Sequence, residues 1–311
     1  MLFSLILLGL VAGAVIPFQT SINTRLSYYT QSTFYASTIS FFVGTLCLMI
    51  LIVSLSPHIL SINYWQTLTI DETWFIGGIM GVLFLTGNLL LLPKIGASLT
   101  VISTITGQIM MGCLIDTFGW FHISPQPFTF IKALGLCLLL FGIVLMNIQR
   151  RHTMLKQSND SLILWIVAGL LFGCAPPIQA ATNSALGQNV NSPFLAALIS
   201  FTVGTITLFM ITAICHRKFR IKRIHKEYGS LRWWYFIGGA LGVLFVTTII
   251  ILTAYIGVTY TLVATMIGQI LASLIIDHFG LLGIPSRKIS PQRIMGLIII
   301  LFAVVIIHFA P

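Results

Sequence analysis

Long apolar runs separated by short polar segments dominate the chain. A helix needs about 20 mostly apolar residues to cross the hydrocarbon core of a bilayer. The runs lack the strict alternation of barrel strands, and backbone amides in lipid must be satisfied within their own segment, so we predict transmembrane helices. Ten runs are long enough: Leu2–Asn23, Phe34–Leu55, Trp74–Leu92, Ala97–Ile115, Phe128–Ile148, Leu162–Asn183, Phe194–Ile214, Tyr235–Ala254, Val258–Ile276 and Met295–His308.

Polar and glycine positions of the first half recur in the second half with the same spacing. The motif Pro-x-Gln-x-x-x-Asn places Gln19 and Asn23 in one half and Gln179 and Asn183 in the other. Further motifs recur: Ser-Phe-x-Val-Gly-Thr from Ser40 and Ser200, Gly-Gly-x-x-Gly-Val from Gly77 and Gly238, and Gly-Gln followed by Asp-x-Phe-Gly from Gly107 and Gly268. Such self-similarity indicates a duplicated unit.

We therefore predict an all-α polytopic membrane protein with ten transmembrane helices. A first five-helix repeat occupies 1–148, a cytoplasmic linker 149–160, and a second five-helix repeat 161–311. Because five is odd, the second repeat must enter the membrane from the opposite side, and we expect an inverted 5+5 repeat related by a pseudo-two-fold axis in the membrane plane.

The distribution of basic residues predicts the orientation. Lys and Arg are enriched in cytoplasmic loops, and the predicted topology puts fifteen of them on one side of the membrane and only Lys132 on the other. We expect the basic loops to lie in the cytoplasm, with both termini on the non-cytoplasmic side of the cell (inner or plasma) membrane. The basic loop 215–232 would rest on anionic lipid; alternatively, it is a binding patch for nucleic acid or an anionic ligand.

Composition excludes several other classes of protein. Apolar residues make up 57% of the chain and charged residues 7%, whereas soluble domains have about 45–50% and about 25%. This composition excludes a soluble globular domain. Five cysteines without paired spacing are typical of small buried side chains. The chain contains no metalloprotease, nucleophile-elbow or P-loop motif, so we predict neither an enzyme nor a metal or cofactor site.

Uncharged polar residues inside the fourth and ninth spans are candidates for contact with a substrate. Thr104 and Gln108 step along one span in intervals of four, as Thr265 and Gln269 do along the other. The topology places both glutamines near mid-membrane, where they would line a shared central site. The alternative is that these side chains join helices through hydrogen bonds worth about 1 kcal/mol each.

The repeated amides near the two prolines are a second candidate set. Gln19 and Asn23 are four residues apart and share a helix face, as do Gln179 and Asn183. Each pair follows a proline, which frees a carbonyl in the preceding turn. These amides would contact the substrate, act as gates, or simply pack between helices.

Two repeated acids lie at span ends. Inversion places Asp116 at the outer mouth and Asp277 at the cytoplasmic mouth. We interpret them as residues for proton or ion coupling or for gating, with capping of loops as the alternative. The Gly-x-x-x-Gly pairs that begin at Gly9, Gly77, Gly169 and Gly238 predict close helix packing.

These motifs together resemble those of the drug/metabolite transporter superfamily, and more narrowly its YdcZ-like branch, along nearly the whole chain. The resemblance implies an inverted five-helix duplication and a transport role. Small multidrug exporters of that superfamily use a glutamate in their first helix, and the first span here has none. We therefore do not carry over their proton-for-cation exchange.

The sequence thus predicts a secondary transporter that exports a small polar or amphipathic metabolite by alternating access. Its expected partners are a small-molecule substrate and the lipid bilayer, with proton or ion coupling left open and no nucleic acid. The alternative function is a non-transporting membrane scaffold or sensor that signals through the basic loop 215–232.

Overall fold

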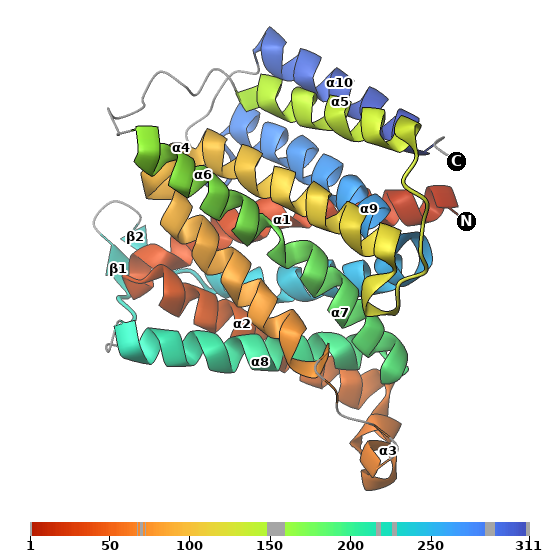
Figure 1. Ribbon diagram of the computed structural model, residues 1–311. Coiled ribbons are helices and arrows are strands. Elements are labelled where there is room, and N and C mark those ends of the chain that lie inside the picture. The colour runs from red at the N-terminus through yellow and green to blue at the C-terminus, as the bar shows by residue number, and fades with distance from the viewer. Residues whose placement is uncertain are drawn as a thin grey trace.

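The computed structural model describes residues 2–66, 68, 71, 73–147, 159–215, 219–225, 229–283 and 290–308. The chain is almost entirely helical there (Figure 1). In order, the elements are α1 (Leu2–Thr30), α2 (Thr33–Leu55), η1 (Pro57–Leu60), α3 (Ile62–Gln66), α4 (Thr73–Phe118), η2 (Trp120–His122), α5 (Phe130–Asn147), α6 (Asn159–Gly173), α7 (Ala175–Asn189), α8 (Pro193–Cys215), β1 (Ile224–His225), β2 (Gly229–Ser230), η4 (Trp233–Phe236), α9 (Gly238–Phe279), η5 (Leu281–Gly283) and α10 (Pro291–His308).

The long helix α4 folds back on itself. Gly87 lies against Phe172, whereas Gly107 lies against Leu170 on the same stretch of α6. In a straight helix, Gly87 and Gly107 would be about 30 Å apart. The element therefore consists of two antiparallel arms, which we call the first arm (residues 73–91) and the second arm (residues 100–118), and these match the third and fourth predicted spans.

The helix α9 also has two arms, separated at Gly257. This glycine has φ 79° and ψ 175°, a conformation outside the helical region that only glycine adopts readily. Gly9 of α1 contacts both Leu252 before the break and Ala264 after it, so the arms run side by side. The first arm (residues 238–256) and second arm (residues 258–279) match the eighth and ninth predicted spans.

Helices of one repeat pack on helices of the other. Helix α1 lies against α9, α6 and α7 against α4, α2 against α8, and α5 against α10. Equivalent residues meet between α2 and α8: the Phe41 and Phe201 ring centroids are 5.1 Å apart, and the Thr45 and Thr205 hydroxyl oxygens are 3.2 Å apart. A residue can touch its own counterpart only at the axis that relates the copies, so the pseudo-two-fold axis passes here.

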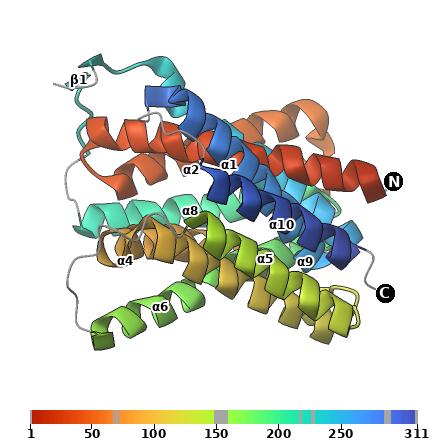
Figure 2. The ribbon, with the colours of Figure 1, turned by 90° about the horizontal axis from the view of Figure 1, so that it is seen from above.

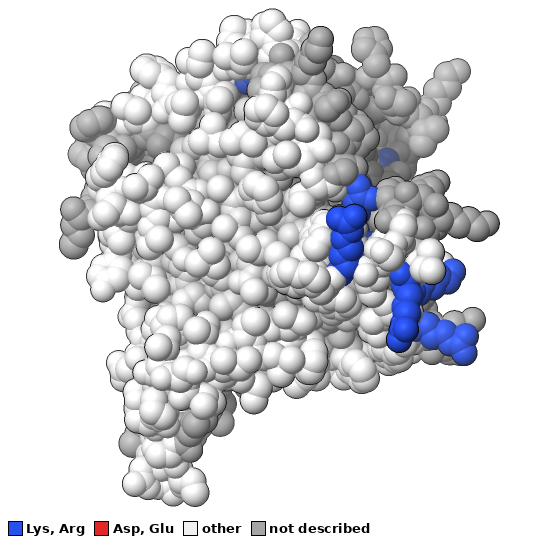
Figure 3. Space-filling model, turned by 180° about the vertical axis from the view of Figure 1, so that it is seen from behind, with Lys and Arg blue, Asp and Glu red and all other residues white. Residues whose placement is uncertain are grey.

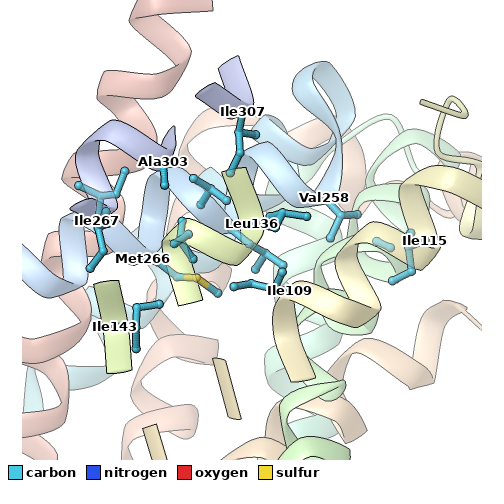
Figure 4. Packing of buried hydrophobic residues seen from close by; sticks show 14 of the residues in the cluster. Ile109, Ile115, Leu136, Ile143, Val258, Met266, Ile267, Ala303 and Ile307 are labelled. Atoms are coloured by element: carbon cyan, nitrogen blue, oxygen red, sulfur yellow. The ribbon is translucent and has the colours of Figure 1, made fainter. Parts of the chain in front are cut away.

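One hydrophobic cluster is built from the second arms of α4 and α9 together with α5 and α10 (Figure 4). Ile109 and Ile115 of α4 are buried together with Val258 and Met266 of α9. Leu136 of α5 and the α10 side chains of Ala303 and Ile307 close the cluster. This cluster joins the two repeats in a region that is separate from the contact of α2 with α8.

The two termini lie at the same end of the molecule, opposite the β1–β2 hairpin, in both ribbon views (Figures 1 and 2). Basic side chains gather at the hairpin end of the molecule (Figure 3). We call this end the basic end. Its described basic residues include Arg25, Arg220, Lys222, Arg223 and Arg232. Lys132 is buried at the opposite end, which we call the Lys132 end. The segregation of charge expected from the sequence is therefore present in the fold.

Five helical stretches within the described residues are long and apolar enough to cross a membrane, and three shorter apolar helices accompany them. The longest stretch, Trp233–Ile276, contains both arms of α9. The two arms of α4 and the two arms of α9 count as separate spans, and α6 with α7 counts as one interrupted span. Counted in this way, the described helices correspond to the ten predicted spans. The interruption falls at Cys174, because Pro176 and Pro177 lack the N–H groups that would continue the helix.

Two sequence boundaries differ from the structure. Helix α1 continues to Thr30, seven residues beyond the predicted end at Asn23. The hydroxyls of Ser21, Thr24 and Thr30 are satisfied within the helix, because each donates to the main-chain carbonyl four residues earlier. Most of the predicted linker 149–160 lies outside the described residues, and its last two residues, Asn159 and Asp160, begin α6.

Candidate functional site

The amides of α1 lie against glycines of α9. Gln19 contacts Gly242 and Asn23 contacts Gly238, so an amide pair spaced by four residues matches a glycine pair spaced by four on an antiparallel helix. Side-chain volume on α9 would displace both amides. The Gly-x-x-x-Gly motif of the second repeat is therefore the docking surface for the Pro-x-Gln-x-x-x-Asn motif of the first.

The same arrangement recurs with the repeats exchanged. Gln179 of α7 contacts Gly81, and Asn183 contacts Gly77, both on the first arm of α4. Asn183 is 1% exposed, and its Nδ2 donates to the Ser200 hydroxyl at 3.1 Å. Its Oδ1 is fully buried without a hydrogen-bond donor and faces the glycine, where a Cα–H group is the available weak donor.

The paired amides differ in exposure. Gln19, Asn23 and Gln179 are half-buried, whereas Asn183 is fully buried. Asn183 therefore has mainly the contacts of a packing residue, while both glutamines keep part of their surface open.

The mid-span polar residues occupy a second symmetric region. Gly13 lies against the backbone of Thr265, and Gly173 lies against the backbone of Thr104. The threonine hydroxyls bond to their own helices: Thr104 donates to the Thr100 carbonyl at 2.8 Å, and Thr265 to the Leu262 carbonyl at 3.0 Å. Both threonines thus present backbone, rather than free hydroxyls, to the opposite repeat.

Gln108 and Gln269 follow the next pair of contact glycines. Gly107 packs on the Leu170 carbonyl, and Gly268 packs on the Leu10 carbonyl. Gln108 is 9% exposed, and no hydrogen bond joins its amide to another residue in the described part of the chain. The role of Gln108 in contact with a substrate stays a prediction.

Asp116 lies at the Lys132 end and reaches across to the other repeat. The residue is 1% exposed. Its Oδ1 accepts a hydrogen bond from the Val258 amide at 2.9 Å, and its Oδ2 accepts one from the Thr259 amide at 2.7 Å. Asp116 therefore caps the second arm of α9 directly after the Gly257 break. Two backbone amides that the helix itself cannot bond are thus satisfied by the Asp116 side chain.

Asp277 lies within the last turn of α9, and its side chain falls outside the described residues. The adjoining η5 is at the basic end, where the Leu282 carbonyl accepts a hydrogen bond from Arg25 at 3.1 Å. The backbone thus places the two repeated acids at opposite ends of the molecule.

Sequence reasoning missed two residues that bind near Asp116 at the Gly257 break. Gln126 Nε2 donates to the Ile256 carbonyl at 3.4 Å, and Lys132 Nζ donates to Gln126 Oε1 at 3.2 Å. The Lys132 ammonium also lies 5.2 Å from the centre of the Tyr260 ring. A signal for the helix break was present, because Ile256-Gly257 repeats Ile95-Gly96 at the offset of the other motifs.

Comparison with known proteins identifies the family. The family described as "Putative inner membrane exporter, YdcZ", of the drug/metabolite transporter group, matches residues 4–145 and again residues 164–306. A solved structure titled "Crystal structure of protein" has the same fold, with a TM-score of 0.69 and 11% sequence identity over 97% of this chain and 94% of that one. No curated protein matches. The chain therefore belongs to the YdcZ family of inner membrane exporters and contains two copies of its unit.

Proposed function

We propose that this exporter moves a small polar or amphipathic metabolite by alternating access between its two repeats. The observation that carries the proposal is the glycine-on-amide packing that recurs with the repeats exchanged. The most extensive helix contacts, α1 with α9, α5 with α10, α4 with α6 and α7, and α2 with α8, join one repeat to the other. A rocking motion of one repeat would therefore change both ends of the molecule in opposite senses. Glycine surfaces permit this motion because they do not interlock through long side chains.

The substrate would lie against the amides that keep accessible or unpaired polar groups. Gln108 and Gln269 are the central contacts in this proposal, and Gln19 and Gln179 extend the site along α1 and α7. Asn23 and Asn183 hold the amide pairs on the glycines, while Thr104 and Thr265 shape the backbone beside Gln108 and Gln269. An amide presents both a donor and an acceptor, which suits a polar substrate without a fixed charge.

Asp116 and Asp277 would act at the two ends of the pathway, where gating or ion coupling takes place. Moving one charge across the membrane is worth about 2.3 kcal/mol per 100 mV. The proposed orientation places the basic end in the cytoplasm, because basic residues gather there.

The test uses the purified full-length chain. A panel of metabolites and drugs is screened for thermal stabilisation, and the stabilising compound is then measured as radiolabelled flux into liposomes. Gln108→Leu and Gln269→Leu should each reduce flux about tenfold or more, the equivalent of about 1.4 kcal/mol. Asn88→Leu is the matched control, because Asn88 Nδ2 donates to the Phe84 carbonyl of its own helix at 2.9 Å.

The control should retain flux within about twofold, a difference of less than 1 kcal/mol. Full flux in both leucine variants would remove the glutamines from the site. If no compound in the panel moves while the basic loop 215–232 recruits a cytoplasmic protein, the scaffold interpretation would be favoured instead.

A further inference from the structure

The break at Gly257 leaves backbone groups that the helix itself cannot satisfy. The Ile256 carbonyl ends the first arm of α9, and the Val258 and Thr259 amides begin the second. Such groups are expensive within a bilayer unless another part of the protein bonds them. The conformation of α9 therefore depends on partners from outside the helix.

The first repeat supplies partners on both sides of the break. Asp116 accepts from the two amides, and Gln126 donates to the Ile256 carbonyl. The two residues are themselves joined, because the Gln126 backbone amide donates to the Asp116 carbonyl at 2.8 Å. Lys132 on α5 holds the other end of the Gln126 amide. This set of contacts, which we call the Asp116 junction, ties α4, the loop after it and α5 to α9.

The charge of Asp116 is central to the junction. A carboxylate offers two charged acceptor oxygens, whereas a carboxylic acid offers one carbonyl oxygen and a hydroxyl oxygen that is a much poorer acceptor. Protonation would thus weaken one of the two amide bonds and remove the attraction between the negative charge and the helix N-terminus. The second arm of α9 would lose its cap.

The other titratable groups that face Asp116 do not replace this interaction. Cys113 is on the same arm of α4, Tyr260 on the second arm of α9, and Lys132 on α5. Within the described residues, no ion pair joins Asp116 to Lys132, whose ammonium is directed to Gln126 and the Tyr260 ring. The amides of Val258 and Thr259 are therefore the direct partners of the carboxylate.

We infer that Asp116 is a positioning residue for transport: its carboxylate holds the second arm of α9 in place at the Lys132 end, and a proton taken up by Asp116 releases that arm. The part that this release plays in the transport cycle rests on the proposed function. The ligand of the Asp116 junction is the proton. Lowering the pH on the side of the membrane that the Lys132 end faces should release the arm in the same way.

The experiment measures amide hydrogen exchange in the full-length chain in lipid nanodiscs and needs no substrate. Exchange at Val258 and Thr259, corrected for the intrinsic effect of pH, should accelerate about tenfold or more as the solution is acidified. Asp116→Asn should exchange faster than the wild type at neutral pH and should show no acceleration with acid, because its Oδ1 can still accept from one amide but the side chain carries no charge and binds no proton as the pH falls.

Asp71→Asn is the matched acidic control. Asp71 lies outside the Asp116 junction, and its Oδ2 accepts from Asn189 at 3.1 Å. Its exchange profile at Val258 and Thr259 should match that of the wild type. Identical pH profiles in the wild type and Asp116→Asn, or wild-type amides that stay protected at acid pH, would overturn the inference. Absence of flux with an intact exchange profile would count against the proposed function alone.

Discussion

The hydroxyls of Thr45 and Thr205 lie 3.2 Å apart, and the two residues hold the same position in the two repeats. Contact between equivalent residues requires that the repeats face each other across an axis. The Phe41–Phe201 pair, one turn away on the same helices, has the same property. The axis is therefore lined by a polar pair and an aromatic pair, each contributed equally by both repeats.

This contact predicts a cross-link. In a chain whose five native cysteines are replaced, Thr45→Cys combined with Thr205→Cys should form a disulfide on mild oxidation. The product would be detected by mass spectrometry after proteolysis between the repeats. Thr45→Cys with Thr207→Cys is the control, because Thr207 is on another face of α8 and bonds to its own Val203 carbonyl. Equal cross-linking in both pairs would contradict the axis.

The glycine-on-amide contacts predict a strong effect of a single methyl group. In Gly238→Ala the new Cβ would collide with Asn23 Oδ1, and overpacking of this kind costs about 1–3 kcal/mol. Thermal unfolding in detergent should show a lower transition temperature. Asn23→Ala in the same chain should recover much of the loss, because it removes the atom that collides.

Gly112→Ala is the control for that series. The nearest atom to its new Cβ would be the end of the Leu262 side chain at 3.2 Å, which can move. This variant should unfold close to the wild-type temperature. If Gly238→Ala did so too, the packing of α1 on α9 would be looser than the structure shows.

The segregation of basic residues predicts the orientation in cells. A membrane-impermeant thiol reagent should label a Ser124→Cys chain in intact cells, because Ser124 is exposed at the Lys132 end. An Arg220→Cys chain should be labelled only after permeabilisation, because Arg220 is exposed at the basic end. Both chains would be made in the cysteine-free background. The opposite pattern would reverse the proposed orientation.

Tyr64 predicts a pH dependence outside the membrane spans. Its hydroxyl donates to the Val190 carbonyl and so joins α3 to the end of α7. Burial raises the pKa of Tyr64 above its usual value. The folded protein therefore retains the proton more strongly than the unfolded chain, and the contribution is complete below the ordinary tyrosine value of about 10 and is lost as the pH rises through the higher folded value.

Tyr64→Phe should accordingly lower the free energy of unfolding by about 1 kcal/mol at neutral pH. The difference from the wild type should shrink when denaturation is measured above about pH 10. Tyr28→Phe is the control, since Tyr28 is exposed on α1. A difference that stays constant across the alkaline range would mean that the contribution of the hydroxyl does not depend on the protonation of Tyr64.

Much of the fold could be predicted from the sequence, because hydrophobic length and internal repetition both act along the chain. The split of α4 and α9 into arms follows from Pro93 and Gly257, which interrupt apolar runs. The family was predicted correctly from the repeated motifs. The extension of α1 to Thr30 could not be predicted from hydropathy, because the added turns carry several polar side chains.

The site was harder to predict, because its geometry depends on contacts between distant segments. The sequence indicated that Gln19, Gln179 and the Gly-x-x-x-Gly pairs matter, but not that amides and glycines contact one another. Gln126 gave no signal, and Lys132 was distinguished only as the one basic residue predicted on the non-cytoplasmic side. Their significance depends on main-chain groups at the Gly257 break, and the sequence does not indicate which side chains reach those groups. The roles of the glutamines in binding and of Asp116 and Asp277 in gating stay predictions.

The packing of α1 on α9 has a consequence for biosynthesis. Gly9 and Gly13 meet Ala264 and Thr265, more than 240 positions further along the chain. While the ribosome is still translating, the glycine surface of α1 has only lipid or insertion machinery beside it. A nascent chain stopped before α9 is therefore expected to be recognised by quality-control proteases, and maturation should await nearly complete translation.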